Sequence, residues 1–206
     1  MPAEEPANPP KPPSRQVTER KISDAKTMRA LAHPVRLELL ELIRRDGETT
    51  ATRAAEALGE SPGNMSWHLQ TLARYGFIEE ADGGKGRSRP WRITSDVSHI
   101  STTGADQSTV AAGKALAGLM LDARVERWRA WLAAADSYSE EWQKAAPTIS
   151  SMTYLTSAEL QQITDELVEL LSRFTERLDP EQRPKGTLPV QLTAFGYPLP
   201  PTQSGN

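Results

Sequence analysis

The stretch TATRAAEALGESPGNMSWHLQTLARYG, residues 50–76, decides the fold of this 206-residue chain. Its first part predicts a short helix that ends at Leu58, because the next residue is a glycine. A second helix is expected from Pro62, which suits a first helical turn and follows Ser61, a good N-cap residue. This helix ends just before Gly76. Two short helices joined by a tight turn form a helix-turn-helix unit.

The residues upstream of this unit predict two more helices. Apolar residues recur at three- and four-residue spacing over 22–32, which indicates a helix. Pro34 interrupts the pattern, because proline disfavours helix at the residue before it and can open a new helix itself. The next helix is therefore expected over 34–45, and the β-branched Thr49 and Thr50 predict one short strand.

Two strand-like pieces follow the unit, FIEE at 77–80 and WRIT at 91–94, separated by the glycine-rich loop ADGGKGRSRP. This order predicts a β-hairpin with a long basic loop. Three helices, a short strand and a terminal hairpin make a winged helix. We therefore expect a mainly α protein whose N-terminal domain, residues 18–95, has a three-helix core and a β-hairpin wing.

The helix expected over 62–75 has two chemically different faces. At about 100° per residue, Met65, Leu69 and Leu72 cluster on one side and must face the core. The opposite side carries small, amide, aromatic and basic groups, and fewer charges than a merely solvated face. The candidate DNA contacts on this helix are Gly63, Asn64, Ser66, Trp67, Gln70 and Arg74.

Two of these side chains suit the major groove of DNA. Gln70 can pair with adenine, and Trp67 can lie against thymine methyl groups or pack its edge on the sugar backbone. Gly63 and Asn64 lie at the positive end of the helix, where backbone amides can meet phosphate. The alternative is that Trp67 folds back onto the protein and Gln70 is only solvated.

The predicted wing is basic. Alternation along a strand places Lys85, Arg87 and Arg89 on one side, and glycines at 83, 84 and 86 let the loop approach a backbone closely. Such residues suit phosphate contact or entry into the minor groove, so we add these three cations to the candidate DNA contacts. A loop that is simply solvated is the alternative.

Together these motifs resemble the ArsR-type winged helix-turn-helix transcriptional regulators. The resemblance covers residues 26–94 and rests on LAHPVRLELLELI, RAAEALG, NMSWHLQTLARYGFIEE and the glycine- and arginine-rich wing. It implies a dimeric DNA-binding regulator, often a repressor that an inducer releases. By resemblance, Ser66, Trp67 and Gln70 take the base-facing positions.

The chain departs from the metal sensors of that family. It has no cysteine, which excludes disulfides, thiolate metal sites and a cysteine nucleophile. His68 lies one turn from Met65 and Leu72, so we expect a structural residue at the edge of the core. His33 precedes Pro34 and is expected to complete a turn. We therefore expect no metal and no cofactor.

The second half predicts a linker over 96–106 and a helical domain over 107–206. Two helices are expected there, over 107–145 and 157–178, with a capping box at the start of the second. The segments 149–155 and 188–195 are expected to form one small strand pair.

The first of these helices carries a broad apolar stripe. A helix nearly 40 residues long cannot bury such a stripe within so small a half, which favours a second subunit. The aromatic residues could instead line a pocket for an apolar small-molecule effector. The candidates for a dimer interface or an effector pocket are Leu116, Met120, Trp128, Trp131, Tyr138 and Trp142.

The composition of the chain predicts a tail, two halves of opposite charge and a location in the cell. Residues 1–17 contain six of the sixteen prolines and read as a disordered tail. The net charge is +3 over residues 20–95 and −5 over 96–206, so a basic half is joined to an acidic one. No apolar run approaches the roughly 20 residues of a membrane helix, and no secretory signal begins the sequence, so we expect a soluble cytoplasmic protein.

Two functions compete. The first is a homodimeric transcriptional regulator that represses from an inverted-repeat operator in double-stranded DNA. It would bind through the helix at 62–75 and the wing at 81–92. The alternative is a winged helix that binds other proteins, with the proline-rich tail as a docking segment. We expect no enzyme, because no catalytic triad order, phosphate-binding loop or close carboxylate pair stands out.

Overall fold

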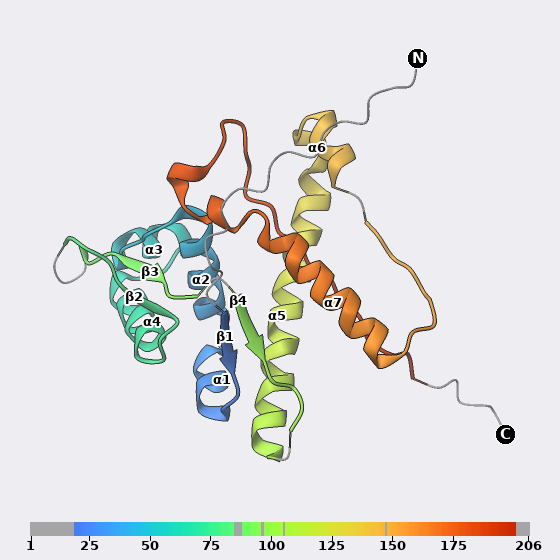
Figure 1. Ribbon diagram of the computed structural model, residues 1–206. Helices are drawn as coiled ribbons and strands as arrows, with labels where there is room; N and C mark the ends of the chain where they lie inside the picture. The colour runs from blue at the N-terminus through green and yellow to red at the C-terminus, as the bar shows by residue number, and fades with distance from the viewer. Residues whose placement is uncertain (1–18, 85–87, 96, 105, 147, 201–206) are drawn as a thin grey trace.

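The computed structural model describes residues 19–84, 88–95, 97–104, 106–146 and 148–200 (Figure 1). The tail expected over 1–17 lies outside this range. The helices are α1 (Ala25–Leu31), α2 (Pro34–Asp46), α3 (Ala51–Leu58), α4 (Pro62–Arg74), α5 (Gln107–Ala134), α6 (Glu140–Ala145) and α7 (Ser157–Ser172). The strands are β1 (Glu19–Ile22), β2 (Ile78–Glu80), β3 (Trp91–Ile93) and β4 (Val97–Ile100). The protein is therefore mainly helical, as predicted.

The predicted helix-turn-helix unit is formed by α3 and α4. The Thr50 side chain caps α3 by accepting a hydrogen bond from the backbone N–H of Arg53, at 3.2 Å. Gly59 ends the helix in the left-handed conformation with φ 68°, which glycine adopts without strain. The Ser61 side chain then caps α4, accepting from the N–H of Asn64 at 3.2 Å. Both predicted helices are confirmed, and so is the predicted Ser61 cap.

The wing begins as a short antiparallel pair. In β2 and β3, Ile78 lies opposite Ile93 and Glu80 lies opposite Trp91. Thr49 adds a bridge to Trp91, with N–H to carbonyl distances of 3.1 and 2.8 Å. The hairpin is therefore confirmed, whereas the short strand expected at Thr49 and Thr50 is reduced to this single bridge at Thr49. In the loop, a Cβ on Gly84 would lie 2.0 Å from the carbonyl oxygen of Ser88, so this turn requires glycine.

The N-terminal helix and the linker differ from the prediction. The helix expected over 22–32 begins only at Ala25, and Ile22 ends strand β1, which pairs in parallel with β4. Strand β4 lies inside the expected linker, 96–106. The spacing of Ile22 fits a helix as well as a strand, and its pairing partner Ile100 is far away in the sequence. Only the tertiary fold could decide between the two structures.

The core of the winged helix extends into α5. Leu116 is fully buried and belongs to the same apolar cluster as Met28 of α1, while Met120 packs against that cluster. Gly113 allows this close approach, because a Cβ there would lie 2.2 Å from the carbonyl oxygen of Ser101. Leu116 is therefore covered by its own chain and has no exposed surface to offer to a dimer interface.

The C-terminal helices are shorter than predicted. The helix expected over 107–145 is interrupted after α5 by the 3-10 turn Ala135–Ser137, and α6 follows. The helix expected over 157–178 ends at Ser172, and Thr175–Leu178 is a 3-10 turn. The capping box between Thr156 and Glu159 is confirmed.

The strand pair expected between 149–155 and 188–195 is wrong. Both segments are described, and neither contains a strand. Their apolar side chains suit a strand, but backbone pairing also needs a complete ladder of donors, and Pro189 has no N–H to give.

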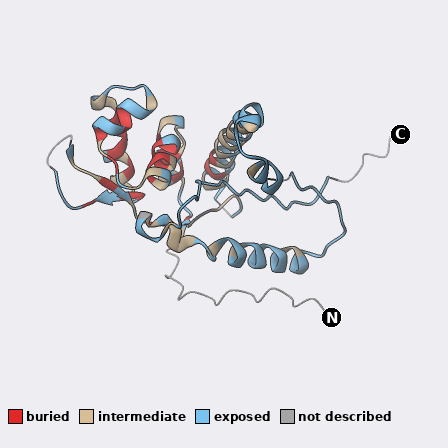
Figure 2. Cartoon of the chain, turned by 90° about the horizontal axis from the view of Figure 1, so that it is seen from above, coloured by how far each residue is buried: buried red, intermediate tan, exposed pale blue. Residues whose placement is uncertain are grey.

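Burial is distributed very unevenly along the chain. Figure 2 shows the buried residues gathered in the N-terminal helices and the first turns of α5, whereas α7 is exposed along its length. Beyond Leu116, no residue in the described part of the chain is buried. None of the described helices is long and apolar enough to cross a membrane.

Candidate nucleic-acid interface

Helix α4 has the two faces that its sequence predicts. Met65, Leu69 and Leu72 are each 0% exposed and anchor the helix in the core. The opposite face carries Gly63, Gln70 and Arg74, which are exposed, and Trp67, which is 57% exposed; Asn64 and Ser66 are half-buried at its edges. This face contains no acidic residue. The structure therefore presents the predicted side chains on one surface.

The start of α4 is open to an approaching group. No atom lies within 4 Å of the position that a Cβ on Gly63 would occupy. The side-chain amide of Asn64 is engaged differently, because its nitrogen donates to Glu60 Oε2 at 2.9 Å. Backbone amides near Gly63 suit phosphate contact better than the Asn64 side chain does.

Trp67 is supported by neighbours but not covered by them. Its ring meets His68 edge-on at 4.7 Å between centroids, and the Arg36 guanidinium lies 5.9 Å from the indole centroid. The Thr71 hydroxyl donates to the Trp67 carbonyl oxygen at 2.9 Å. The indole is thus held at a defined angle while more than half of its surface faces solvent.

His68 lies in the protein interior beneath this face, as expected for a structural residue. It is 2% exposed, and its ring lies 4.7 Å from that of His33. Burial lowers the pKa of His68, and the nearby His33 and Arg36 lower it further. His33 is the N-cap residue of α2, directly before Pro34, which agrees with the expected turn. Within the described ranges, no cluster of three acidic or histidine residues could hold a metal ion.

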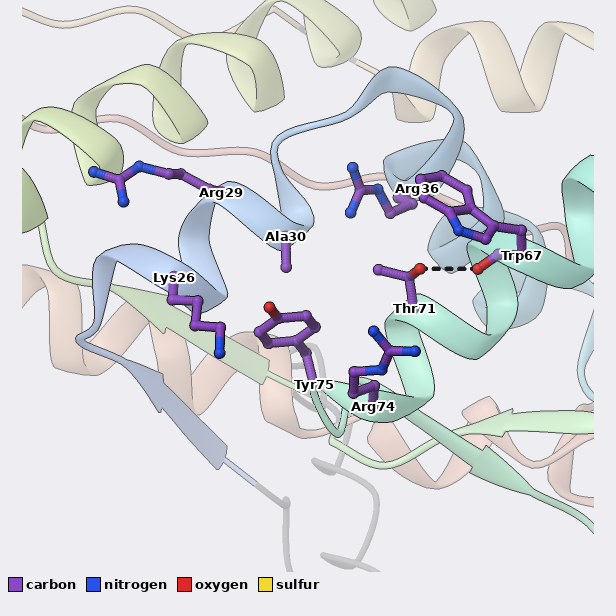
Figure 3. Close-up of a pocket in the computed structure, with 8 residues that line it drawn as sticks. All are labelled: Lys26, Arg29, Ala30, Arg36, Trp67, Thr71, Arg74 and Tyr75. Carbon is purple, nitrogen blue, oxygen red and sulfur yellow. Dashed lines mark hydrogen bonds between the residues drawn. The ribbon is translucent and has the colours of Figure 1, made fainter.

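A hollow of about 320 Å³ lies beside the exposed face of α4 (Figure 3). It is lined by Lys26, Arg29 and Ala30 from α1, Arg36 from α2, Trp67, Thr71 and Arg74 from α4, and Tyr75. Four of these eight residues are cations and none is acidic. Sequence reasoning missed the hollow because its cations come from three helices. The only local signal was the pair Lys26 and Arg29, one turn apart on α1.

The wing is less basic than its loop sequence implies. Lys85 and Arg87 lie outside the described residues. Arg89 forms an ion pair with Glu80, and Arg92 Nε donates to Glu79 Oε1 at 2.8 Å. The acids belong to the facing strand β2, so counting charges along the loop alone did not reveal them. Two wing cations are therefore partly neutralised.

The aromatic stripe of the second half remains largely uncovered. Trp128 is 48% exposed and Tyr138 is 39% exposed, while Trp131 and Trp142 are half-buried. These residues lie on α5, the turn after it and α6, beyond the part of α5 that packs on the winged helix.

Comparison with known proteins identifies the domain that carries α4. Residues 31–81 match a family described as a helix-turn-helix domain. The chain therefore contains a helix-turn-helix domain, with α3 and α4 as its two helices. A comparison with curated proteins found no match to the chain.

Solved structures give only distant similarities. Reduced HlyU from Vibrio cholerae aligns with 18% identity and a TM-score of 0.28, covering 46% of this chain and 87% of its own. A transcriptional regulator homologue from Pyrococcus horikoshii has 20% identity and a TM-score of 0.30, covering 50% and 93%. A ZitR variant from Lactococcus lactis in the apo form has 13% identity and a TM-score of 0.31, covering 71% and 88%.

Proposed function

We propose that the chain is a cytoplasmic, sequence-specific DNA-binding transcriptional regulator of the ArsR-like kind. Helix α4 enters the major groove, with Ser66, Trp67 and Gln70 toward the bases. The wing lies on the adjacent backbone and adds phosphate contacts through Lys85, Arg87 and Arg89. The match to a helix-turn-helix domain supports this assignment.

One observation carries the proposal. The outer face of α4 is free of acids and holds an amide, an indole and a guanidinium in the open, while its inner face is fully buried. Gln70 can form a bidentate pair with adenine, and Trp67 offers an apolar surface to thymine methyl groups. Acidic side chains there would be repelled by the backbone phosphates, so their absence favours a polyanionic partner.

We propose further that two copies assemble through the second half. The described residues beyond Leu116 are nowhere buried, yet they include the stripe of Trp128 and the apolar residues of α7. A single chain leaves this surface in water, and a second copy would remove it. A two-fold dimer reads an inverted repeat. A dimer bound to such a site would block polymerase, so we propose that the protein is a repressor. An apolar effector would act at the same stripe.

Selection of bound sequences from random DNA, at a stated salt concentration, tests the proposal. It predicts an inverted repeat whose half-sites are about one helical turn apart, or a multiple of it. Failure to enrich any sequence, with binding of a protein partner instead, would favour the alternative of a protein-interaction module. A single asymmetric half-site would contradict the dimeric arrangement.

A further inference from the structure

The hollow beside α4 gathers positive charge without a counter-ion. Lys26 and Arg29 line it from α1 and Arg74 lines it from α4, although Figure 3 shows the Arg29 side chain extending away from the other cations. Among the described residues, none of these three cations forms an ion pair or a side-chain hydrogen bond. Elsewhere in the winged helix, exposed arginines such as Arg45, Arg89 and Arg92 do pair with carboxylates. Within the described ranges, Lys21, Arg44 and Arg53 also lack an ion pair, so the hollow is distinguished by the four cations that line one space.

Arg36 is the second, independent sign of a missing anion. Its residue is only 9% exposed, and its Nε is buried with no hydrogen-bond partner in the described chain. In Figure 3 its guanidinium lies on the side of the Trp67 indole that faces the hollow. Burial lowers the pKa of Arg36, as expected for a cation that has lost water without gaining a carboxylate. A buried guanidinium N–H without an acceptor is costly, and an anion in the hollow would supply that acceptor.

The position of the hollow indicates that its anion is a DNA phosphate. Trp67 and Arg74 belong both to its lining and to the outer face of α4, so the hollow borders the surface proposed to enter the major groove. A helix in that groove has a phosphate backbone along each flank. The wing follows the C-terminal end of α4, and the hollow lies on the flank toward α1.

The openness of the hollow also favours a phosphate of a bound polymer over a small ligand. Lys26, Arg29 and Arg74 are all exposed and Trp67 is more than half exposed, so a small ligand would stay largely in water. Small-molecule sites usually enclose most of their ligand. A phosphate that belongs to a bound polymer needs no such enclosure, because the remaining contacts already hold it nearby.

We propose that this hollow is a backbone-phosphate site, in which Lys26, Arg29, Arg36 and Arg74 receive a DNA phosphodiester on the flank of α4 opposite the wing. The inference rests on the proposed function and adds a second backbone contact to it. Exposed Lys26 and Arg29 supply the attraction, while Arg36 donates from the inner wall. The Tyr75 hydroxyl, which has no side-chain hydrogen bond in the described chain, is available as a further donor.

The first test compares exposed cations on and off the site. The Lys26→Gln/Arg29→Gln double variant should weaken binding to the selected sequence and to random DNA by a similar factor, roughly tenfold at 0.15 M salt. The slope of log K against log salt should become shallower by about 1 per copy. Lys185→Gln removes an exposed cation far from the hollow in sequence and should change neither quantity.

The second test uses Arg36, with folding measured separately. Arg36→Met keeps the length of the side chain and removes an unpartnered charge, so urea unfolding should show stability equal to or above that of the parent. DNA affinity should nevertheless fall. Replacing single phosphates of the selected site with neutral methylphosphonates should locate one position per half-site that weakens the parent but leaves Arg36→Met unaffected.

Three results would overturn the inference. The first is an unchanged salt slope in Lys26→Gln/Arg29→Gln. The second is the absence of any methylphosphonate position that is coupled to Arg36. The third is that millimolar inorganic phosphate, at constant ionic strength, displaces DNA from the parent protein but not from Lys26→Gln/Arg29→Gln. That result would assign the hollow to a free anion. In each case a retained preference for the selected sequence would leave the proposed function standing, whereas loss of that preference in the parent protein would reject the proposed function itself.

Discussion

Gln70 and Arg89 illustrate two kinds of DNA contact at the scale of single residues. Gln70 stands on the outer face of a rigid helix whose inner face is fully buried, so it can read one base. Arg89 stands on the wing and is held by Glu80, so part of its charge is already neutralised. Phosphate contacts respond to charge alone, whereas base contacts respond to sequence.

Neutralising Glu80 should therefore strengthen DNA binding. Glu80→Gln releases Arg89 from its ion pair, and the affinity for specific and random DNA should rise together by a few-fold at low salt. Titration of both DNAs at several salt concentrations measures this effect. Glu56→Gln, an exposed acid on α3, tests how much of the gain comes from net charge alone. A smaller affinity in Glu80→Gln than in Glu56→Gln would remove Arg89 from the interface.

His68 should make stability depend on pH. Its pKa is lowered in the folded protein, so the unfolded chain takes up a proton first as the pH falls. Stability should be complete above the ordinary histidine pKa of about 6.5 and should decrease as the pH drops below it. Thermal unfolding between pH 7.5 and 5.5 measures the trend. His68→Leu should flatten it, and an equally steep trend in that variant would assign the effect to other groups.

At the scale of elements, the sequence predicted the helix-turn-helix unit closely and the rest less well. Short-range signals such as Ser61, Thr50 and the Gly76 stop are local, and they fixed the bounds of α3 and α4. The β1–β4 pair depends on contact between distant segments, which no local pattern contains. For the same reason the exposed face of α4 could be predicted, whereas the hollow, which three helices form together, could not.

The N-terminal part of helix α5 should unfold together with the winged helix. Leu116→Ala should lower the free energy of unfolding of the whole winged helix by about 2–5 kcal/mol, because Leu116 is fully buried against the α1 core. Leu121→Ala provides a matched control, since Leu121 lies on the same helix but is 40% exposed. Urea unfolding followed by circular dichroism measures both. Equal effects of the two substitutions would contradict the shared core.

At the scale of the whole molecule, the absence of burial beyond Leu116 in the described residues predicts self-association. Sedimentation at micromolar concentration should show a dimer. Trp128→Glu should shift it toward monomer, because Trp128 belongs to the exposed apolar stripe. Ala130→Glu adds the same charge on the opposite side of α5 and should not. A monomeric parent protein would reject the dimer, and with it the expected inverted repeat.

Base recognition by the outer face of α4 can be measured with the Gln70→Ala/Trp67→Ala double variant. Circular dichroism first establishes that the variant is folded, which the exposure of both side chains predicts. Its affinity for the selected sequence and for random DNA is then measured at the same salt concentration. We expect a loss of about 1–3 kcal/mol per substituted contact and half-site on the selected sequence, with little change on random DNA. An equal loss on both DNAs in the folded variant would contradict the placement of α4 in the major groove.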